Sequence, residues 1–89
     1  MPGTPFQFYY NDNQYEARAE YQPVVKGLRR YKLCFPNIQS IVEGSVHVCE
    51  TTEGKWSIEK IMTVHPIPKE FLENITDGFI AFIETQKVG

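Results

Sequence analysis

The run of residues 41–64 constrains the fold of this chain more than any other part. It holds two segments in which apolar and polar side chains alternate, joined at residues 51–54. Alternation with a period of two is typical of a strand that is buried on one face, and Gly54 can adopt the positive φ that a short loop requires. The run therefore predicts a hairpin of two antiparallel strands, residues 41–50 and 55–64.

The register of this hairpin decides which side chains share a face. A three-residue loop at 52–54 pairs Val48 with Ile58. A pairing shifted by two residues pairs Val48 with Trp56 instead and keeps the same faces, so the faces are better determined than the register. The predicted inward face carries Val42, Val46, Val48, Trp56, Ile58, Met62 and Val64. The predicted outward face carries Glu43, Ser45, His47, Cys49, Ser57, Glu59, Ile61 and Thr63.

Two alternating segments near the N-terminus, residues 5–10 and 15–22, flank a turn that contains no glycine. Asn and Asp tolerate left-handed backbone conformations. We therefore expect a first hairpin with a two-residue loop at Asp12 and Asn13.

The alternation then lapses at residues 23–27. Pro23 removes a backbone donor and Gly27 frees the backbone, so this stretch predicts a connection rather than a strand. A further strand is predicted over residues 28–35, which brings the expected number of strands to about five.

A helix is predicted over residues 68–85. Pro68 is tolerated in its first turn, because the backbone there needs no amide hydrogen. Apolar residues recur there at helical spacing and form one stripe, which consists of Phe71, Leu72, Ile75, Phe79, Phe82 and Ile83. Gly78 lies at the edge of this stripe, and we expect close contact with a strand to explain it. Ile80 projects away from the stripe and has no obvious core to enter.

These elements predict a single α+β domain over residues 1–89, with an antiparallel sheet in meander-like order and one C-terminal amphipathic helix on one face. A helix is about 10 Å wide, whereas five strands span about twice that width. One helix cannot cover a whole face, and the opposite face of the sheet is expected to be open.

Composition and motifs exclude several classes of function. The formal charge of −2 gives no overall attraction to nucleic acid or to anionic membranes. The chain has no apolar run long enough to span a bilayer, and its first residues lack the features of a secretory signal. No nucleophile elbow or phosphate-binding glycine loop is present. We expect a cytoplasmic protein that is not an enzyme and binds no cofactor.

The open face of the predicted sheet carries more apolar surface than a solvated face requires. We expect a small protein–protein interaction module, either a homodimer or an accessory or inhibitory subunit, although scattered surface hydrophobics are common in all proteins. The candidate partner-binding residues are Tyr9, Arg18, Lys32, His47, Cys49, Ile61 and Ile80.

Two other functions remain open. Four basic residues lie within seven positions and could bind nucleic acid or an acidic protein, or could form a solvated strand edge; they are Lys26, Arg29, Arg30 and Lys32. A small apolar ligand could also lie between helix and sheet, against Trp56 and the phenylalanines, although these residues are typical of a core.

His47 and Cys49 share a predicted face with Cys34. Zinc sites usually need four ligands with CxxC-type spacing, which this chain lacks, so we expect no metal site. A disulfide between Cys34 and Cys49 stays open if their strands are neighbours, although a reducing cytoplasm would prevent it.

Overall fold

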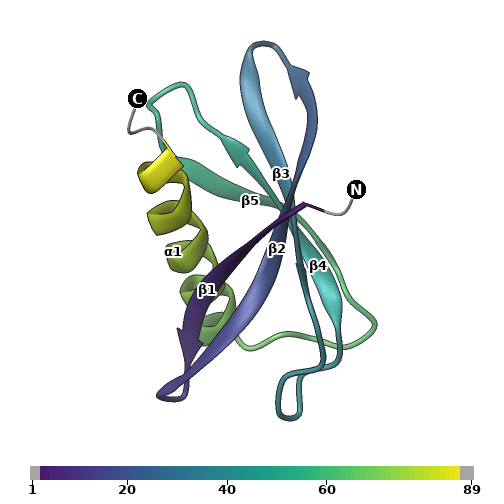
Figure 1. Cartoon of the computed structure of the whole chain (residues 1–89). Coiled ribbons are helices and arrows are strands. Elements are labelled where there is room, and N and C mark those ends of the chain that lie inside the picture. The colour runs from purple at the N-terminus through teal and green to yellow at the C-terminus, as the bar shows by residue number, and fades with distance from the viewer. Residues whose placement is uncertain (1–2, 87–89) are drawn as a thin grey trace.

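The computed structural model describes residues 3–86 and consists of an antiparallel sheet with one helix packed on it (Figure 1). The elements in chain order are β1 (Thr4–Tyr10), β2 (Asn13–Val25), β3 (Leu28–Phe35), β4 (Gly44–Glu50), β5 (Trp56–Met62) and α1 (Lys69–Gln86). The five strands lie in the sheet in the order of the sequence, so each strand pairs with the next. The predicted α+β class and meander order are confirmed.

The first hairpin turns one residue earlier than expected. Asn11 and Asp12 both have positive φ, 51° and 64°, and form the two-residue turn. Turns of this kind match the twist of the flanking strands. Tyr10 therefore pairs with Asn13, and Phe8 pairs with Tyr15. The predicted loop at Asp12 and Asn13 is wrong, but the register differs by two residues and every side chain keeps its predicted face.

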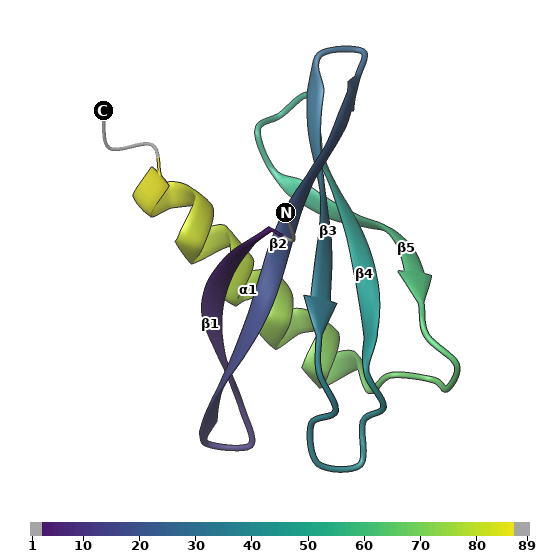
Figure 2. The same ribbon diagram turned by 45° about the vertical axis from the view of Figure 1, so that its right-hand side comes forward.

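The predicted connection at residues 23–27 is also wrong. β2 continues to Val25 and turns at Lys26 and Gly27, whose φ angles are 56° and 78°. The pairing with β3 shifts by one residue between Gln22 and Val25, so Pro23 lies at an irregularity of the strand. A proline that donates no hydrogen bond is tolerated at such a bulge. The resulting hairpin projects beyond the other strands (Figures 1 and 2).

The loop between β4 and β5 matches the three-residue prediction. The amide of Thr51 donates to the carbonyl oxygen of Lys55 at 2.6 Å, and Val48 pairs with Ile58. Gly54 has a φ of 82°, which is the positive value expected from the sequence.

The second half of β5 departs from the prediction because the strand contains a bulge. Val48 pairs with Ile58, whereas its neighbour His47 pairs with Lys60, so Glu59 is an extra residue. Beyond this bulge Ile61 pairs with the buried Val46 and therefore faces the helix side. The outward placement of Ile61 is wrong, because one inserted residue exchanges the two faces.

The same bulge changes the position of Met62. This residue pairs with Ser45 on the face away from the helix, so its predicted inward placement is wrong. Val42 and Val64 lie outside the strands and are exposed, which contradicts their predicted burial.

The loop between β3 and β4 completes the core. The backbones of Ile38 and Ile41 exchange two hydrogen bonds, of 2.9 and 2.7 Å, and both side chains are buried. β4 begins at Gly44 rather than at residue 41, since this small turn takes up the first part of the predicted strand.

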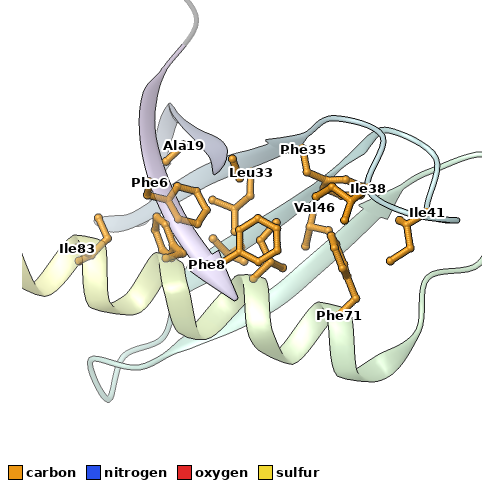
Figure 3. Packing of buried hydrophobic residues seen from close by; sticks show 14 residues of the cluster. Phe6, Phe8, Ala19, Leu33, Phe35, Ile38, Ile41, Val46, Phe71 and Ile83 are labelled. Atoms are coloured by element: carbon orange, nitrogen blue, oxygen red, sulfur yellow. The ribbon is translucent and has the colours of Figure 1, made fainter. Parts of the chain in front are cut away.

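The core lies between the sheet and α1, which crosses the strands obliquely (Figure 2). Its buried side chains are Phe6, Phe8, Ala17, Ala19, Leu33, Phe35, Ile38, Ile41, Val46, Val48, Phe71, Ile75, Phe79 and Ile83. Figure 3 shows Phe71 beside the loop isoleucines at one end of this cluster and Ile83 at the other. The ring centroids of Trp56 and Phe79 are 4.9 Å apart and the two rings are perpendicular. This contact packs the start of β5 against the helix.

Candidate functional site

The predicted partner-binding residues divide between two surfaces of the molecule. We call the sheet face away from α1 the open face and the other the helix-side face. The strand pairing places on the open face Tyr9, Arg18, Lys32, His47 and Cys49. Ile61 lies on the helix-side face, and Ile80 is a half-buried residue of α1. The seven residues therefore do not form one site.

The centre of the open face is a row of polar side chains that crosses four strands. Glu20 pairs with Lys32, Lys32 with His47, and His47 with Lys60. Burial lowers the pKa of His47, and the positive charges of Lys32 and Lys60 lower it further. The row favours hydration, because charged and polar groups occupy adjacent positions on all four strands.

The two cysteines are not bonded to each other. Cys34 pairs with Ser45 and Cys49 with Arg30, and both thiols are free. Burial raises the pKa of the Cys34 thiol, and the Glu20 carboxylate beside it raises that pKa further. The thiol donates a 3.5 Å hydrogen bond to Glu20 Oε2. Burial and the Glu20 carboxylate therefore both favour the protonated Cys34 thiol over the thiolate.

The basic cluster of residues 26–32 is also dispersed by the fold. Lys26 lies at the tip of the β2–β3 hairpin, whereas Arg30 and Lys32 point to the open face. Arg30 Nε and Nη2 donate to the two carboxylate oxygens of Glu59 at 3.1 and 3.3 Å. Nothing in the sequence around Arg30 predicts that Glu59, on a strand far along the chain, neutralises its charge.

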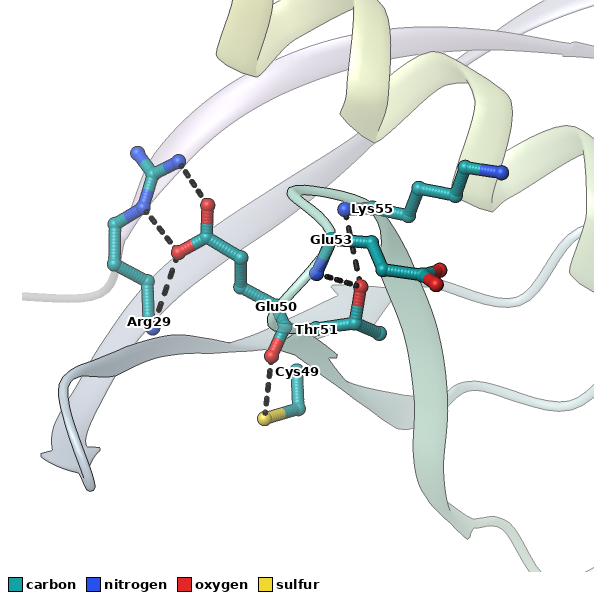
Figure 4. Close-up of polar contacts among 6 residues, drawn as sticks. All are labelled: Arg29, Cys49, Glu50, Thr51, Glu53 and Lys55. Carbon is teal, nitrogen blue, oxygen red and sulfur yellow. Dashed lines mark hydrogen bonds and ion pairs between the residues drawn. The ribbon is translucent and has the colours of Figure 1, made fainter.

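Arg29 belongs to the helix-side face. It donates from Nε and Nη2 to the two carboxylate oxygens of Glu50 at 3.1 and 3.0 Å (Figure 4). This hydrogen bonding raises the pKa of the Arg29 guanidinium, whose central carbon lies 5.3 Å from the centroid of the Trp56 ring. The guanidinium is thus held by a carboxylate and an aromatic face, and the four basic residues offer no common surface to a nucleic acid.

The exposed apolar side chains gather around β5. Among the side chains that the structure describes, seven large apolar ones are exposed: Tyr9 63%, Tyr21 56%, Val42 42%, Ile58 40%, Ile61 44%, Met62 48% and Val64 82%. Five of these lie between residues 42 and 64. α1 packs most closely against β1, at the opposite edge of the sheet, so β5 is left largely uncovered.

Between β5 and the helix lies a surface depression of about 320 Å³, which Lys55, Trp56, Ile80 and Glu84 help to line. Ile80, for which the sequence predicted no core, packs against the hydrophobic cluster. Phe71 and Phe79 are fully buried and their rings contact other core rings, so the space between helix and sheet is filled by side chains. This filling gives no support to an apolar ligand inside the domain.

No protein-family model, curated protein or solved structure matches this chain. Within residues 3–86, no group of three or more His, Cys, Asp or Glu side chains is arranged to hold a metal ion. Within the residues that the structure describes, no helix is both long and apolar enough to cross a membrane. The exposed apolar side chains of β5 form the candidate site. We call it the β5 surface and define it as Ile58 and Ile61 on the helix-side face together with Met62 on the open face of this edge strand.

Proposed function

We propose that this protein is a non-catalytic protein–protein interaction module that forms a homodimer through the β5 surface. The observation that carries the proposal is the concentration of exposed apolar side chains on and beside one edge strand. β5 is the last strand of the sheet, so its outer backbone groups have no strand partner within residues 3–86. Edge strands with apolar side chains are surfaces to which a further strand can be added.

The energy available from this surface indicates a weak dimer. Full burial of an Ile or Met side chain stabilises by about 1.5–3 kcal/mol, and each of the three is already about half buried, so about 1 kcal/mol remains per side chain. Six such side chains in a dimer contribute about 6 kcal/mol, against a cost of association of about 4–15 kcal/mol. About four to six backbone hydrogen bonds between the strands, at ~1 kcal/mol each, add ~4–6 kcal/mol. At the low end of the association cost the net gain is about 6–8 kcal/mol, so we expect a dissociation constant of about 1–50 µM.

The same proposal includes a cytoplasmic location. Two half-buried free thiols on neighbouring strands, neither of them bonded, suit a reducing compartment. Binding of an acidic protein or of nucleic acid has less support, because Arg29 and Arg30 already bind carboxylates of the same chain.

Sedimentation velocity tests the homodimer over protein concentrations from about 1 µM to about 500 µM, a range set by the expected weak affinity. The wild-type chain is expected to shift from monomer to dimer within this range. Ile61→Lys should remain monomeric, because it places a charge on the β5 surface that a dimer would bury. Tyr9→Ser, which removes an exposed aromatic side chain from the open face, should behave like wild type.

Two results would overturn the proposal. One is a wild-type chain that stays monomeric at every concentration. The other is a dimer that persists in Ile61→Lys but is lost in Tyr9→Ser, which would place the interface on the open face. Melting temperatures measured at low concentration establish that both variants are folded.

A further inference from the structure

We infer that the two copies pair β5 with β5 in antiparallel orientation, about a two-fold axis located at the bulge formed by Glu59 and Lys60. This inference rests on the proposed homodimer and names its register. It starts from the strand pairing, in which Ile58 lies opposite Val48 and Ile61 lies opposite Val46. Residues three apart in a regular strand point to opposite faces, whereas the bulge brings Ile58 and Ile61 to the same face.

A symmetric dimer requires an interface that is complementary to itself, so that each contact occurs twice. With the axis at the bulge, Ile58 lies opposite Ile61 of the second copy on the helix-side face. Glu59 then lies opposite Lys60 of the second copy on the open face. Each copy thus matches apolar with apolar and negative with positive charge.

Other symmetric registers lack this complementarity. An axis through Glu59 alone places two carboxylates opposite each other, and an axis through Lys60 alone does the same with two ammonium groups. Like charges directly opposite each other destabilise an antiparallel pair. With an axis through Ile58, Ile61 no longer lies opposite an isoleucine of the second copy. Only the axis at the bulge satisfies both the charged and the apolar positions.

The charged groups share the open face. The Arg30 guanidinium on β3 donates to both carboxylate oxygens of Glu59 across β4. Contact with Lys60 of the second copy therefore requires this carboxylate to bind both cations or to turn from Arg30 toward the strand edge. The ion pairs among the described residues join Arg29 to Glu50 and Arg30 to Glu59, so Lys60 belongs to neither. Lys60 therefore brings an ammonium group to the strand edge that a carboxylate of the second copy can bind.

The bulge also explains why a second copy is a better partner than another strand. A bulge and a lysine on an edge strand oppose pairing with a regular strand, because they interrupt the ladder and place a charge at the edge. A second copy carries the same interruption at the same position. In the two-fold arrangement the two irregularities coincide, and the flanking segments pair on both sides of them.

Charge reversal tests the register. Lys60→Glu converts both interchain contacts from attractive to repulsive, so its dimer should dissociate about 5- to 30-fold more readily than wild type. Lys32→Glu changes the net charge equally but lies two strands away from the edge, and its dissociation constant should stay at the wild-type value. Both variants are measured by sedimentation velocity at one ionic strength.

Mixing variants gives the sharper result. Lys60→Glu mixed with Glu59→Lys places two acidic residues of one copy against two basic residues of the other, so a heterodimer should form in preference to either homodimer. The double variant carrying both changes in one chain should recover the wild-type dissociation constant, since its contacts are again of opposite charge. Recovery shows that the losses in the single variants did not come from unfolding or from the lost Arg30 contact.

The outcomes separate this inference from the proposed function. A monomeric wild-type chain overturns both. A wild-type dimer with no heterodimer in the mixture, and with Lys60→Glu indistinguishable from Lys32→Glu, overturns the register and leaves self-association intact. Loss of the dimer in Lys32→Glu alone would move the interface to the open face.

Discussion

The environment of His47 shows how the sheet controls a single titratable group. The side chain is half buried between Lys32 and Lys60 on the neighbouring strands, while Arg30 and Glu59 lie near enough to act on its charge. Burial and the positive charges outweigh the opposite effect of Glu59, so the pKa of His47 in the folded chain lies below its ordinary value. The unfolded chain therefore binds a proton on this group more readily than the folded chain does.

We expect the free energy of unfolding to decrease as the pH falls through about 6.5, the ordinary pKa of histidine. The sign follows from the depressed pKa, because protonation favours the unfolded state. Denaturant unfolding between about pH 7.5 and 5.5 measures the slope, which His47→Gln should reduce. Lys32→Gln should also reduce it, since it removes one of the two cations. A slope that is unchanged in both variants would contradict this assignment.

At the scale of elements, α1 approaches β1 closely at Gly78. A Cβ atom on Gly78 would lie 2.6 Å from the Cβ of Phe8 and 2.8 Å from the carbonyl oxygen of Gln7. This confirms the expectation that Gly78 contacts a strand. The absence of a side chain lets the helix settle on β1, and the helix in turn leaves β5 exposed at the other edge.

Gly78→Ala should destabilise the domain although alanine favours helices. The gain in helix propensity is about 1 kcal/mol. Forcing a methyl group against the Phe8 Cβ and the Gln7 backbone, which cannot turn aside, costs about 2–3 kcal/mol, so we expect a net loss of about 1–2 kcal/mol. The neighbouring Asp77→Ala adds a helix former at an exposed position and should change stability by no more than about 0.5 kcal/mol. Urea denaturation compares the two. Equal or higher stability of Gly78→Ala would contradict the close contact.

For the whole molecule, one aromatic ring joins the helix to separate parts of the sheet. Phe79 is fully buried, and its ring centroid lies 6.0 Å from that of Phe6 in β1, 5.1 Å from Tyr31 in β3 and 4.9 Å from Trp56 in β5. A domain of this size has a free energy of unfolding of about 5 kcal/mol or somewhat more. Single core contacts therefore carry a large share of the total stability.

Phe79→Ala should remove about 3–5 kcal/mol, which leaves the domain only marginally stable at room temperature. Phe79→Leu preserves part of the volume and should remain folded, with a smaller loss that denaturant unfolding can measure. Circular dichroism reports the loss of structure in the alanine variant. Retention of wild-type stability by Phe79→Ala would show that this ring does not unite the two layers.

The candidate site was harder to predict than the fold, and Ile61 shows why. Its position in an alternating pattern placed it on the outward face, but the extra residue Glu59 in β5 reversed every face beyond it. A bulge leaves no local signature here, because Glu and Lys suit either an exposed strand or an irregularity. Similarly, the sequence near the two arginines does not predict their partners. Arg29 binds Glu50 and Arg30 binds Glu59, and both contacts form between different strands.

The amino-acid sequence by itself determined the strands, their antiparallel order and the helix with its buried stripe. These features depend on the periodicity of apolar residues and on turn residues, which act between neighbours in the chain. Only the tertiary structure decided where the helix rests, which faces Ile61 and Met62 occupy and which charges neutralise one another. Those outcomes depend on close packing and on pairing between distant segments, where one glycine or one inserted residue changes the geometry.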